Sequence, residues 1–441
     1  MIRNCLPALL VCAAVTAGAG PAKARRKPLM RDFMGLNAHF KFRPELYRPV
    51  CRLLRNYHNI GWDYGQRPIH KPPAFPLAAN KVDWNKHVYG QWKAAGYQTH
   101  ASIQFGAADG KRWAAAPEST YAYGKAFAAY FGPSGAHRLL TAAEIGNEPS
   151  KIDDETYRKI FRALARGLRD GDPKLKILTA TAAVKPTKWA KALALFEDLG
   201  ALYDVVNVHK YAAAEGWPTW RRSFPEDPRI DFLDTIRAAV DWRDEHAPDK
   251  EVWLTEFGYD ACTDAALQTR QKPFTRWTDV TDRQQAQWLV RSFVVLAAMD
   301  IARAYLYFYN DDDQARVHAA AGLTRGFEPK PSFHAVAHLY RTLGDYRFRR
   351  VVRREAGAVF VFEFVHARAA RAVWVVWSPT GRGRRASVTL SRVPGRAVKA
   401  ERMPLAAGDP PTVAGKRVGA RSYRMRIGES PTYVWFDTGA D

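Results

Sequence analysis

Two glutamates in this sequence each end a short apolar run, and together they could form a catalytic pair. Glu148 lies in AEIGNEP at 143–149, and Glu256 lies in EVWLTEFG at 251–258. Because an unpaired carboxylate is costly to bury, each glutamate is either a solvated strand end or has a function. Two carboxyl groups ~5–5.5 Å apart suit a retaining glycosidase, with one as acid/base and the other as nucleophile, whereas gaps of ~6.5–9.5 Å suit inversion.

The two glutamates need a scaffold that brings their strands together, and the chain has the pattern of a (β/α)8 TIM barrel. Strand-like runs alternate with segments of helical period. A barrel of roughly 250 residues or more fits residues 25–345. The competitor, a doubly wound open sheet, usually has a glycine-rich phosphate turn after its first strand, and MGLNAHF is not one. The expected strands are 33–39, 53–58, 98–105, 142–146, 176–182, 205–209, 252–257 and 304–309.

Polar and aromatic residues at the strand ends are candidates for binding a substrate, because the active site of such a barrel lies at the carboxyl ends of its strands. Glu148 would end the fourth strand and Glu256 the seventh. For single tyrosines the alternative is core packing, and for a lone histidine or Arg55 it is a structural contact. The binding candidates are His39, Arg55, His58, Trp62, Gln104, Asn147, His209, Tyr211, Trp217 and Tyr307.

Residues 346–441 have a different pattern, with short β-rich runs such as GAVFVFEFVHA and RAVWVVWS and no helical period. We expect a small antiparallel β-sandwich domain here, packed on the barrel. This part holds 19 Lys and Arg against 7 Asp and Glu, over half of the net charge of +23. A basic exported protein is attracted to acidic polymers, although scattered surface arginines are the alternative. The absence of interleaved aromatic and basic recognition motifs disfavours nucleic acid.

Residues 1–24 have the pattern of a secretory signal peptide. Arg3 precedes a short apolar run, and residues 22–24 fit an A-x-A cleavage site,. We therefore expect a secreted or periplasmic protein, with a lipid anchor at Cys12 as the alternative. No later stretch has the ~20 apolar residues of a membrane span.

Two cysteines follow that segment, Cys51 and Cys262. They could pair in an oxidising compartment or remain buried thiols. Cysteines and histidines are not clustered at the spacing of a structural zinc site, so neither a metal nor another cofactor is expected.

The ordered set of motifs resembles the clan A glycoside hydrolases, the large retaining (β/α)8 group that includes families 5 and 39. The motifs that carry the resemblance are NEP at 147–149, HKY at 209–211, TEFG at 255–258 and GLTRGFEPKPSFHAVAHLY at 322–340, together with Arg55. Many clan A enzymes place a tryptophan sugar platform at the end of strand eight. This chain has YLYFYN there, so Tyr307 or Phe308 would have to replace it.

The resemblance implies a role for each matched residue. Glu148 would be the general acid and then the base, and Glu256 would be the nucleophile. Asn147 would bind the sugar 2-hydroxyl. Arg55 and Tyr211 would donate to Glu256, and His209 would orient Glu148 or contact sugar.

The sequence thus predicts a monomeric retaining glycoside hydrolase that cleaves β-glycosidic bonds of a polysaccharide, with internal cleavage favoured. Aromatic and basic loop residues make an anionic glycan, sulfated or containing uronic acid, one candidate substrate. The alternatives are an exo-acting β-glycosidase on oligosaccharides and a non-catalytic exported protein that binds glycans or polyanions.

Overall fold

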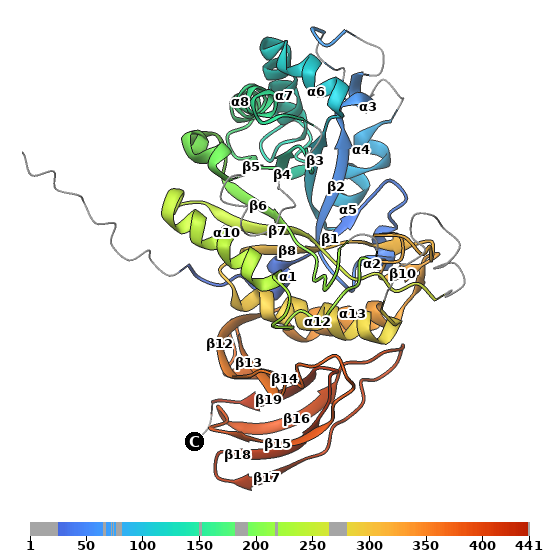
Figure 1. Ribbon diagram of the computed structural model, residues 1–441, viewed down its shortest axis with the longest axis vertical. Coiled ribbons are helices and arrows are strands. Elements are labelled where there is room, and N and C mark those ends of the chain that lie inside the picture. The colour runs from blue at the N-terminus through green and yellow to red at the C-terminus, as the bar shows by residue number, and fades with distance from the viewer. Residues whose placement is uncertain are drawn as a thin grey trace, which may run out of the picture.

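The computed structural model describes residues 25–64, 68–71, 73, 75, 82–149, 152–180, 193–216, 219–263 and 280–439. Eight parallel strands close into a barrel in chain order, from β1 to β8, and β8 pairs back onto β1 (Figure 1). The predicted TIM barrel is therefore confirmed. Its strands are β1 Met34–Ala38, β2 Leu53–Asn59, β3 Gln98–Gln104, β4 Leu140–Ile145, β5 Lys176–Leu178, β6 Val205–His209, β7 Glu251–Phe257 and β8 Arg303–Leu306.

Helices surround the barrel, and the longest of them have capped starts. The Asp153 side chain accepts from the backbone N–H of Thr156 at the start of α8, and Thr281 with Gln284 forms a capping box on α12,. The helices are α1 Met30–Phe33, α2 Pro44–Tyr47, α3 Ile60–Tyr64, α4 Trp84–His87, α5 Tyr89–Ala94, α6 Ala107–Ala114, α7 Pro117–Phe131, α8 Asp154–Gly171, the 3-10 helix η1 Ala194–Leu202, α10 Phe232–His246, α12 Asp282–Ala298 and α13 Pro331–Leu343; the short strands β9 Asn310–Asp311, β10 Thr324–Arg325 and β11 Glu328–Pro329 form a separate sheet before α13.

The barrel interior is apolar at its lower layer and polar above it. Side chains alternate along a strand, so a residue two positions after an inward-pointing apolar residue also points into the barrel. The lower layer needs Gly35, because a Cβ there would lie 2.4 Å from the ring of Tyr305. This layer consists of Leu53, Ala142, Leu178, Val205, Trp253 and Tyr305.

The C-terminal domain consists of two antiparallel sheets, as expected for a β-sandwich. One sheet has the strand order β12-β13-β14-β19-β16 and the other β15-β18-β17, and a separate apolar core includes Trp374 and Phe436. The strands are β12 Tyr346–Glu355, β13 Val359–His366, β14 Arg371–Trp377, β15 Ala386–Ser391, β16 Arg396–Arg402, β17 Gly415–Gly419, β18 Ser422–Ile427 and β19 Thr432–Asp437.

The C-terminal domain lies below α12 and α13 in Figure 1. A buried ion pair of the barrel helps to fasten it there. Arg291 of α12 binds Glu226 through Nε and Nη2 and also donates to the Thr380 carbonyl. Trp377 of β14 donates from Nε1 to the same glutamate, 2.8 Å away. One carboxylate therefore holds groups from both domains, which fixes the sandwich against the barrel.

Two predictions from composition can be compared with this fold. Cys51 and Cys262 are both buried and are not joined to each other, and the Cys262 thiol faces the Asp313 carbonyl. In the part of the chain that the structure describes, no helix is long and apolar enough to cross a membrane. The signal-peptide segment 1–24 and Trp217 lie outside the described residues.

Candidate active site

Arg55 stands at the centre of the barrel mouth and uses all of its hydrogen-bond donors. Its side chain is completely buried. Nε and Nη2 donate to the two oxygens of Glu144 at 2.8 and 3.0 Å. Nη1 donates to Asn37 and Glu256, and Nη2 also donates to Asn147. A guanidinium has five N–H groups, so each one has an acceptor and Arg55 sets the positions of four side chains.

Glu144 is the anion that anchors Arg55, and the sequence analysis did not assign it. It lies on β4, completely buried, with His100 Nε2 3.3 Å from its Oε2. Burial alone would raise the pKa of Glu144, but the adjacent Arg55 guanidinium and His100 lower it to about 2. The signal was present in the alternation, because Glu144 is two residues after the inward-pointing Ala142 and therefore also points inward.

Glu256 reaches the barrel mouth through an irregularity of β7. Inward-pointing Trp253 would place Thr255 inward and Glu256 outward under strict alternation. The pairing of β7 with β8 shifts between Leu254 and Phe257, and the pairing with β6 shifts at the same place. An extra residue in a strand can re-aim a side chain, and here it turns Glu256 toward Arg55.

Three donors surround the Glu256 carboxylate, whose side chain is 7% exposed. Oε1 accepts from Arg55 Nη1 at 2.8 Å and from the Tyr57 hydroxyl at 2.7 Å. Oε2 accepts from the Tyr211 hydroxyl at 2.8 Å. Burial alone would raise the pKa of Glu256, but the electrostatic influence of the neighbouring His209 and Arg55 side chains, followed by the Tyr57 hydrogen bond, holds it below its ordinary value. The result is an ionised, aimed carboxylate.

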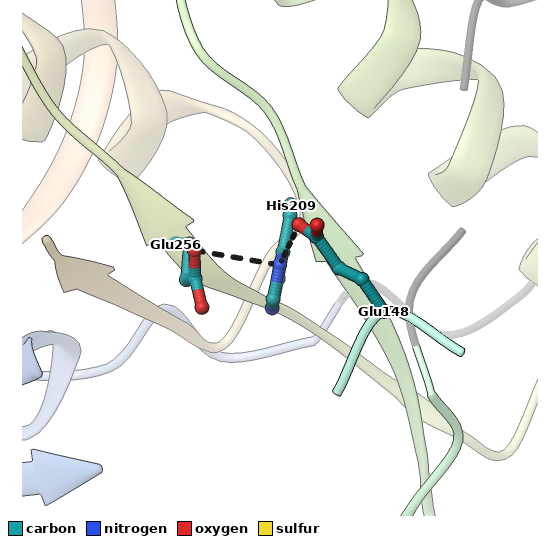
Figure 2. Close-up of side chains that lie close together, drawn as sticks. All are labelled: Glu148, His209 and Glu256. Atoms are coloured by element: carbon teal, nitrogen blue, oxygen red, sulfur yellow. Dashed lines mark hydrogen bonds and ion pairs between the residues drawn. The ribbon is translucent and has the colours of Figure 1, made fainter. Parts of the chain in front are cut away.

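Glu148 faces this carboxylate from the end of β4. Gly146 has φ of +83°, a conformation that L side chains rarely adopt, and it turns the chain between the buried Ile145 and the half-buried Asn147. An oxygen of Glu148, an oxygen of Glu256 and a nitrogen of His209 all lie within 4.8 Å of one another (Figure 2). The Glu148 side chain is 39% exposed, so its environment differs sharply from that of Glu256.

His209 lies between the two glutamates and connects Glu148 to the barrel core (Figure 2). Its Nδ1 is 2.8 Å from Glu148 Oε1 and 3.6 Å from Glu256 Oε2. Its Nε2 is 2.9 Å from the Thr255 hydroxyl, which donates to Asn207. Because the Thr255 proton is used there, Nε2 donates to Thr255. The hydrogen bond between Nδ1 and Glu148 then needs one proton, which either group can carry.

The same three residues could in principle ligate a metal ion, since two carboxylates and an imidazole are common metal ligands. The surroundings of Glu256 disfavour this. Its oxygens already accept from three donors, and one of these is the cationic Arg55. A cation at this place would be repelled by the guanidinium and would compete for occupied lone pairs, so the arrangement suits proton transfer and nucleophilic attack better.

Aromatic rings form one wall of the site, and two of them, Tyr57 and His318, were not anticipated. The Tyr307 ring lies 6.5 Å from that of Tyr57 and 5.3 Å from that of His318. His318 also contacts Tyr211, with 4.5 Å between the ring centroids. His318 has φ of +68°, and its buried Nδ1 has no hydrogen-bond partner among the residues that the structure describes. An imidazole held in a rare backbone conformation beside Tyr211, a donor to Glu256, is a candidate sugar contact.

His58 is the predicted binding residue that the structure contradicts. It is completely buried and binds Asp63 and Tyr89 through its two ring nitrogens, while its ring stacks on Trp84. The physical reason is alternation, because Arg55 points into the barrel and a residue three positions later points out. Tyr57 occupies the inward position that the sequence analysis gave to His58.

The remaining predicted residues lie at the same face with fewer contacts. Half-buried His39 and Trp62 lie next to each other, 5.9 Å between ring centroids, and both pack on Phe40. Gln104 is half-buried at the carboxyl end of β3. Asn147 presents its Oδ1 to Arg55, which leaves its amide N–H groups as the donors for a ligand.

The overall fold is similar to those of solved glycoside hydrolases. A family 39 glycoside hydrolase from the gut symbiont Bacteroides cellulosilyticus WH2 aligns with a TM-score of 0.68 at 15% identity, over 92% of this chain and 81% of that one. A glucosidase from Croceicoccus marinus gives 0.63 at 12% identity, over 93% and 97%. The catalytic domain of a GH30 xylanase C from Talaromyces cellulolyticus gives 0.59 at 13% identity, over 93% and 97%.

No protein-family model and no curated protein matches the sequence. At identities of this size the likeness concerns the fold, and at that level the predicted resemblance to clan A glycoside hydrolases, family 39 among them, is confirmed.

Proposed function

We propose that this chain is a retaining glycoside hydrolase that cleaves β-glycosidic bonds of a polysaccharide by double displacement. The observation that carries the proposal is the short gap between the two carboxylates, since oxygens of Glu148 and Glu256 lie within 4.8 Å. This gap is nearer to the ~5–5.5 Å of retaining enzymes than to the ~6.5–9.5 Å that makes room for the attacking water in inverting ones.

In the first step Glu256 attacks the anomeric carbon, and the bond from that carbon to the leaving oxygen breaks. Oε2 is the attacking atom, because it has one donor, Tyr211, and is the oxygen nearer His209. Oε1 keeps its bonds to Arg55 and Tyr57 and becomes the carbonyl oxygen of the glycosyl ester. The proton shared between Glu148 and His209 goes to the leaving oxygen.

In the second step Glu148, now a carboxylate, takes a proton from water, and the resulting hydroxide attacks the anomeric carbon from the side that the leaving group vacated. The carbon–Oε2 bond breaks, and Glu256 returns to its ionised state beside Arg55. Two inversions at one carbon give retention. The amide N–H groups of Asn147, next to Glu148, make no hydrogen bond within the described ranges and can donate to the sugar 2-hydroxyl throughout.

We propose internal cleavage of a long chain over attack at chain ends. In the part of the chain that the structure describes, the Glu148 side chain is 39% exposed. This exposure supports a barrel mouth that is open to a polymer. An exo-acting β-glycosidase on oligosaccharides is the second candidate. A binding protein without activity is the third, and the complete set of donors around Glu256 argues against it.

The test is a panel of β-linked polysaccharides, with released reducing ends and solution viscosity measured together. Glu148→Gln and Glu256→Gln should each lose activity by about 10³-fold or more, since each removes a group that takes part in bond making. Glu118→Gln, an exposed carboxylate on α7, is the matched control and should keep full activity.

NMR of the first-formed anomer should show retention, and an inverted product would overturn the two-step mechanism. Viscosity that falls well before reducing ends accumulate indicates internal cleavage. Full activity in either glutamate variant would remove that residue from its role.

A further inference from the structure

The boundary between barrel and sandwich contains a groove of about 720 Å³ that the reaction at the barrel mouth does not use. Its walls come from the start of α12, the segment 383–387 and the segment 426–430. A volume of this size is typical of sites that hold several rings of a ligand (~300–1,000 Å³). Its polar character comes mainly from the arginines Arg283, Arg384, Arg385, Arg402 and Arg426.

Four of these arginines are available to an incoming ligand. Arg283, Arg385, Arg402 and Arg426 are exposed, and their side chains make no ion pair or hydrogen bond with any residue that the structure describes. Some surface arginines outside the groove, such as Arg353, are instead matched with a carboxylate. Unmatched guanidinium groups that share one groove repel one another, and an anion between them would relieve that repulsion.

The single carboxylate in the groove does not neutralise the arginines. Glu429 is buried, and its Oε1 accepts from the backbone N–H groups of Arg382 and Gly383, both at 2.7 Å, and from the Thr380 hydroxyl. The Glu429 carboxylate therefore stabilises the backbone of the loop that carries Arg384 and Arg385. The groove therefore has a net positive charge, and the backbone hydrogen bonds to Glu429 hold in place the loop that carries part of it.

One wall of the groove, at the start of α12, lies at the same end of the barrel as the catalytic glutamates,. In a (β/α)8 barrel each helix starts at the face where its preceding strand ends. Arg283 is the second residue of α12, which follows β7 and therefore starts on the face where Glu256 lies. A long polymer in the mouth can thus continue along this face toward the sandwich.

We propose that this groove is a secondary binding site for an anionic polysaccharide, one that carries carboxylate or sulfate groups along its chain. Guanidinium groups bind both anions through paired N–H donors. Among the residues that the structure describes, none that lines the groove is aromatic, so this part of the lining lacks the stacking platforms that single-stranded nucleic acid uses. The inference rests on the proposed function for its glycan substrate, and it makes the arginine groove responsible for retaining that substrate.

The decisive measurement is binding of the full chain to polymers that share a backbone and differ in charge. Dextran sulfate, carboxymethyl dextran and neutral dextran serve as probes, titrated at two salt concentrations. All variants carry Glu256→Gln, so that no polymer is cut and a failure of the proposed hydrolysis leaves the binding result readable. The groove variant replaces Arg283, Arg385, Arg402 and Arg426 by Gln.

The matched control removes four positive charges that are also exposed and lie outside the groove, Arg166, Arg368, Arg392 and Lys416. We expect the groove variant to lose at least tenfold affinity for one or both charged dextrans and the control to lose less than threefold. The slope of log affinity against log salt should flatten by roughly 3 in the groove variant, by analogy with the ~0.7 per charge of single strands. The charged dextran that binds tighter identifies sulfate or carboxylate as the preferred group.

Three results would overturn the proposal. Equal losses in groove and control variants would mean that overall charge, and no defined site, attracts the polymer. Unchanged binding in the groove variant would remove the arginines from recognition. Tighter groove-dependent binding of single-stranded DNA, or of phosphatidylserine vesicles, than of either charged dextran would assign the groove to another class of partner.

Discussion

Replacing Arg55 with methionine tests whether one guanidinium holds the site together. The variant keeps a side chain of similar length but removes the charge and five donors. Glu144 is completely buried and Glu256 nearly so. Within the described part of the chain, both carboxylates would therefore lose the one guanidinium that they bind, while remaining in a low-dielectric environment.

The size of the effect follows from the pKa of Glu144. Arg55, His100 and their hydrogen bonds lower that pKa from an ordinary 4.5 to about 2, which by linkage corresponds to roughly 3 kcal/mol of stability at neutral pH. Removing one partner of a buried ion pair costs about 3–5 kcal/mol in general. Because the folded-state pKa is depressed, this stability is fully present above pH 4.5 and is lost as the pH falls through about 2. The loss of unfolding free energy caused by Arg55→Met should therefore be large at pH 7 and smaller at pH 3.

Urea unfolding followed by tryptophan fluorescence at both pH values measures the deficit. Arg291→Met is the control for burial, since it breaks an equally buried pair with Glu226 far from the site. It should lose comparable stability while kcat/KM of the folded protein is unchanged, whereas Arg55→Met should lose kcat/KM by 10²-fold or more. Adding Glu144→Gln to Arg55→Met should recover part of the stability and none of the activity. If Arg55→Met lost less than about 1 kcal/mol of unfolding free energy at pH 7, or lost the same amount at pH 7 and pH 3, the reasoning would be refuted.

Three further substitutions test individual contacts. Tyr57→Phe removes a hydrogen bond that lowers the pKa of Glu256, so the acidic limb of the kcat/KM profile should move to higher pH with a loss of about tenfold or more at pH 5; a profile unchanged in position would contradict this. His209→Gln removes the partner of Glu148 and should slow substrates with poor leaving groups more than nitrophenyl glycosides, and equal slowing would refute a role in protonation. His318→Asn keeps a side chain that tolerates the left-handed backbone but removes the ring, so KM should rise severalfold while Tm changes little; an unchanged KM would exclude a sugar contact.

The barrel was predictable because its strands are apolar, of similar spacing and ended by polar residues. The prediction of β2 at 53–58 differs from the observed Leu53–Asn59 by one residue. The eighth strand was predicted to end at 309 but ends at Leu306. Apolarity continues through the aromatic residues 307–309, and composition does not reveal that the chain leaves the sheet there to form the wall of the site.

The site was predictable only in part, because strand periodicity assigns faces and local irregularities change them. Counting alternate residues from Arg55 finds Tyr57 and excludes His58, so that error was avoidable. Counting alternate residues from the inward-pointing Ala142 likewise places Glu144 inside the barrel. For Glu256 the count gives the wrong face, since a register shift on β7 turns the side chain inward. Motif identity supplied this residue where periodicity could not.

The segment AEIGNEP shows why two glutamates four residues apart have such different chemistry. Glu144 is inside regular strand, where Arg55 neutralises it and its pKa is about 2. After Gly146 the backbone turns by a positive φ, and Glu148 emerges at the mouth, 39% exposed and hydrogen-bonded to His209 Nδ1. The first carboxylate must never change its charge, because Arg55 and through it Glu256 depend on that charge. In the proposed mechanism the second changes its charge twice in each turnover. One strand can supply both only because the glycine separates the buried environment from the solvated one.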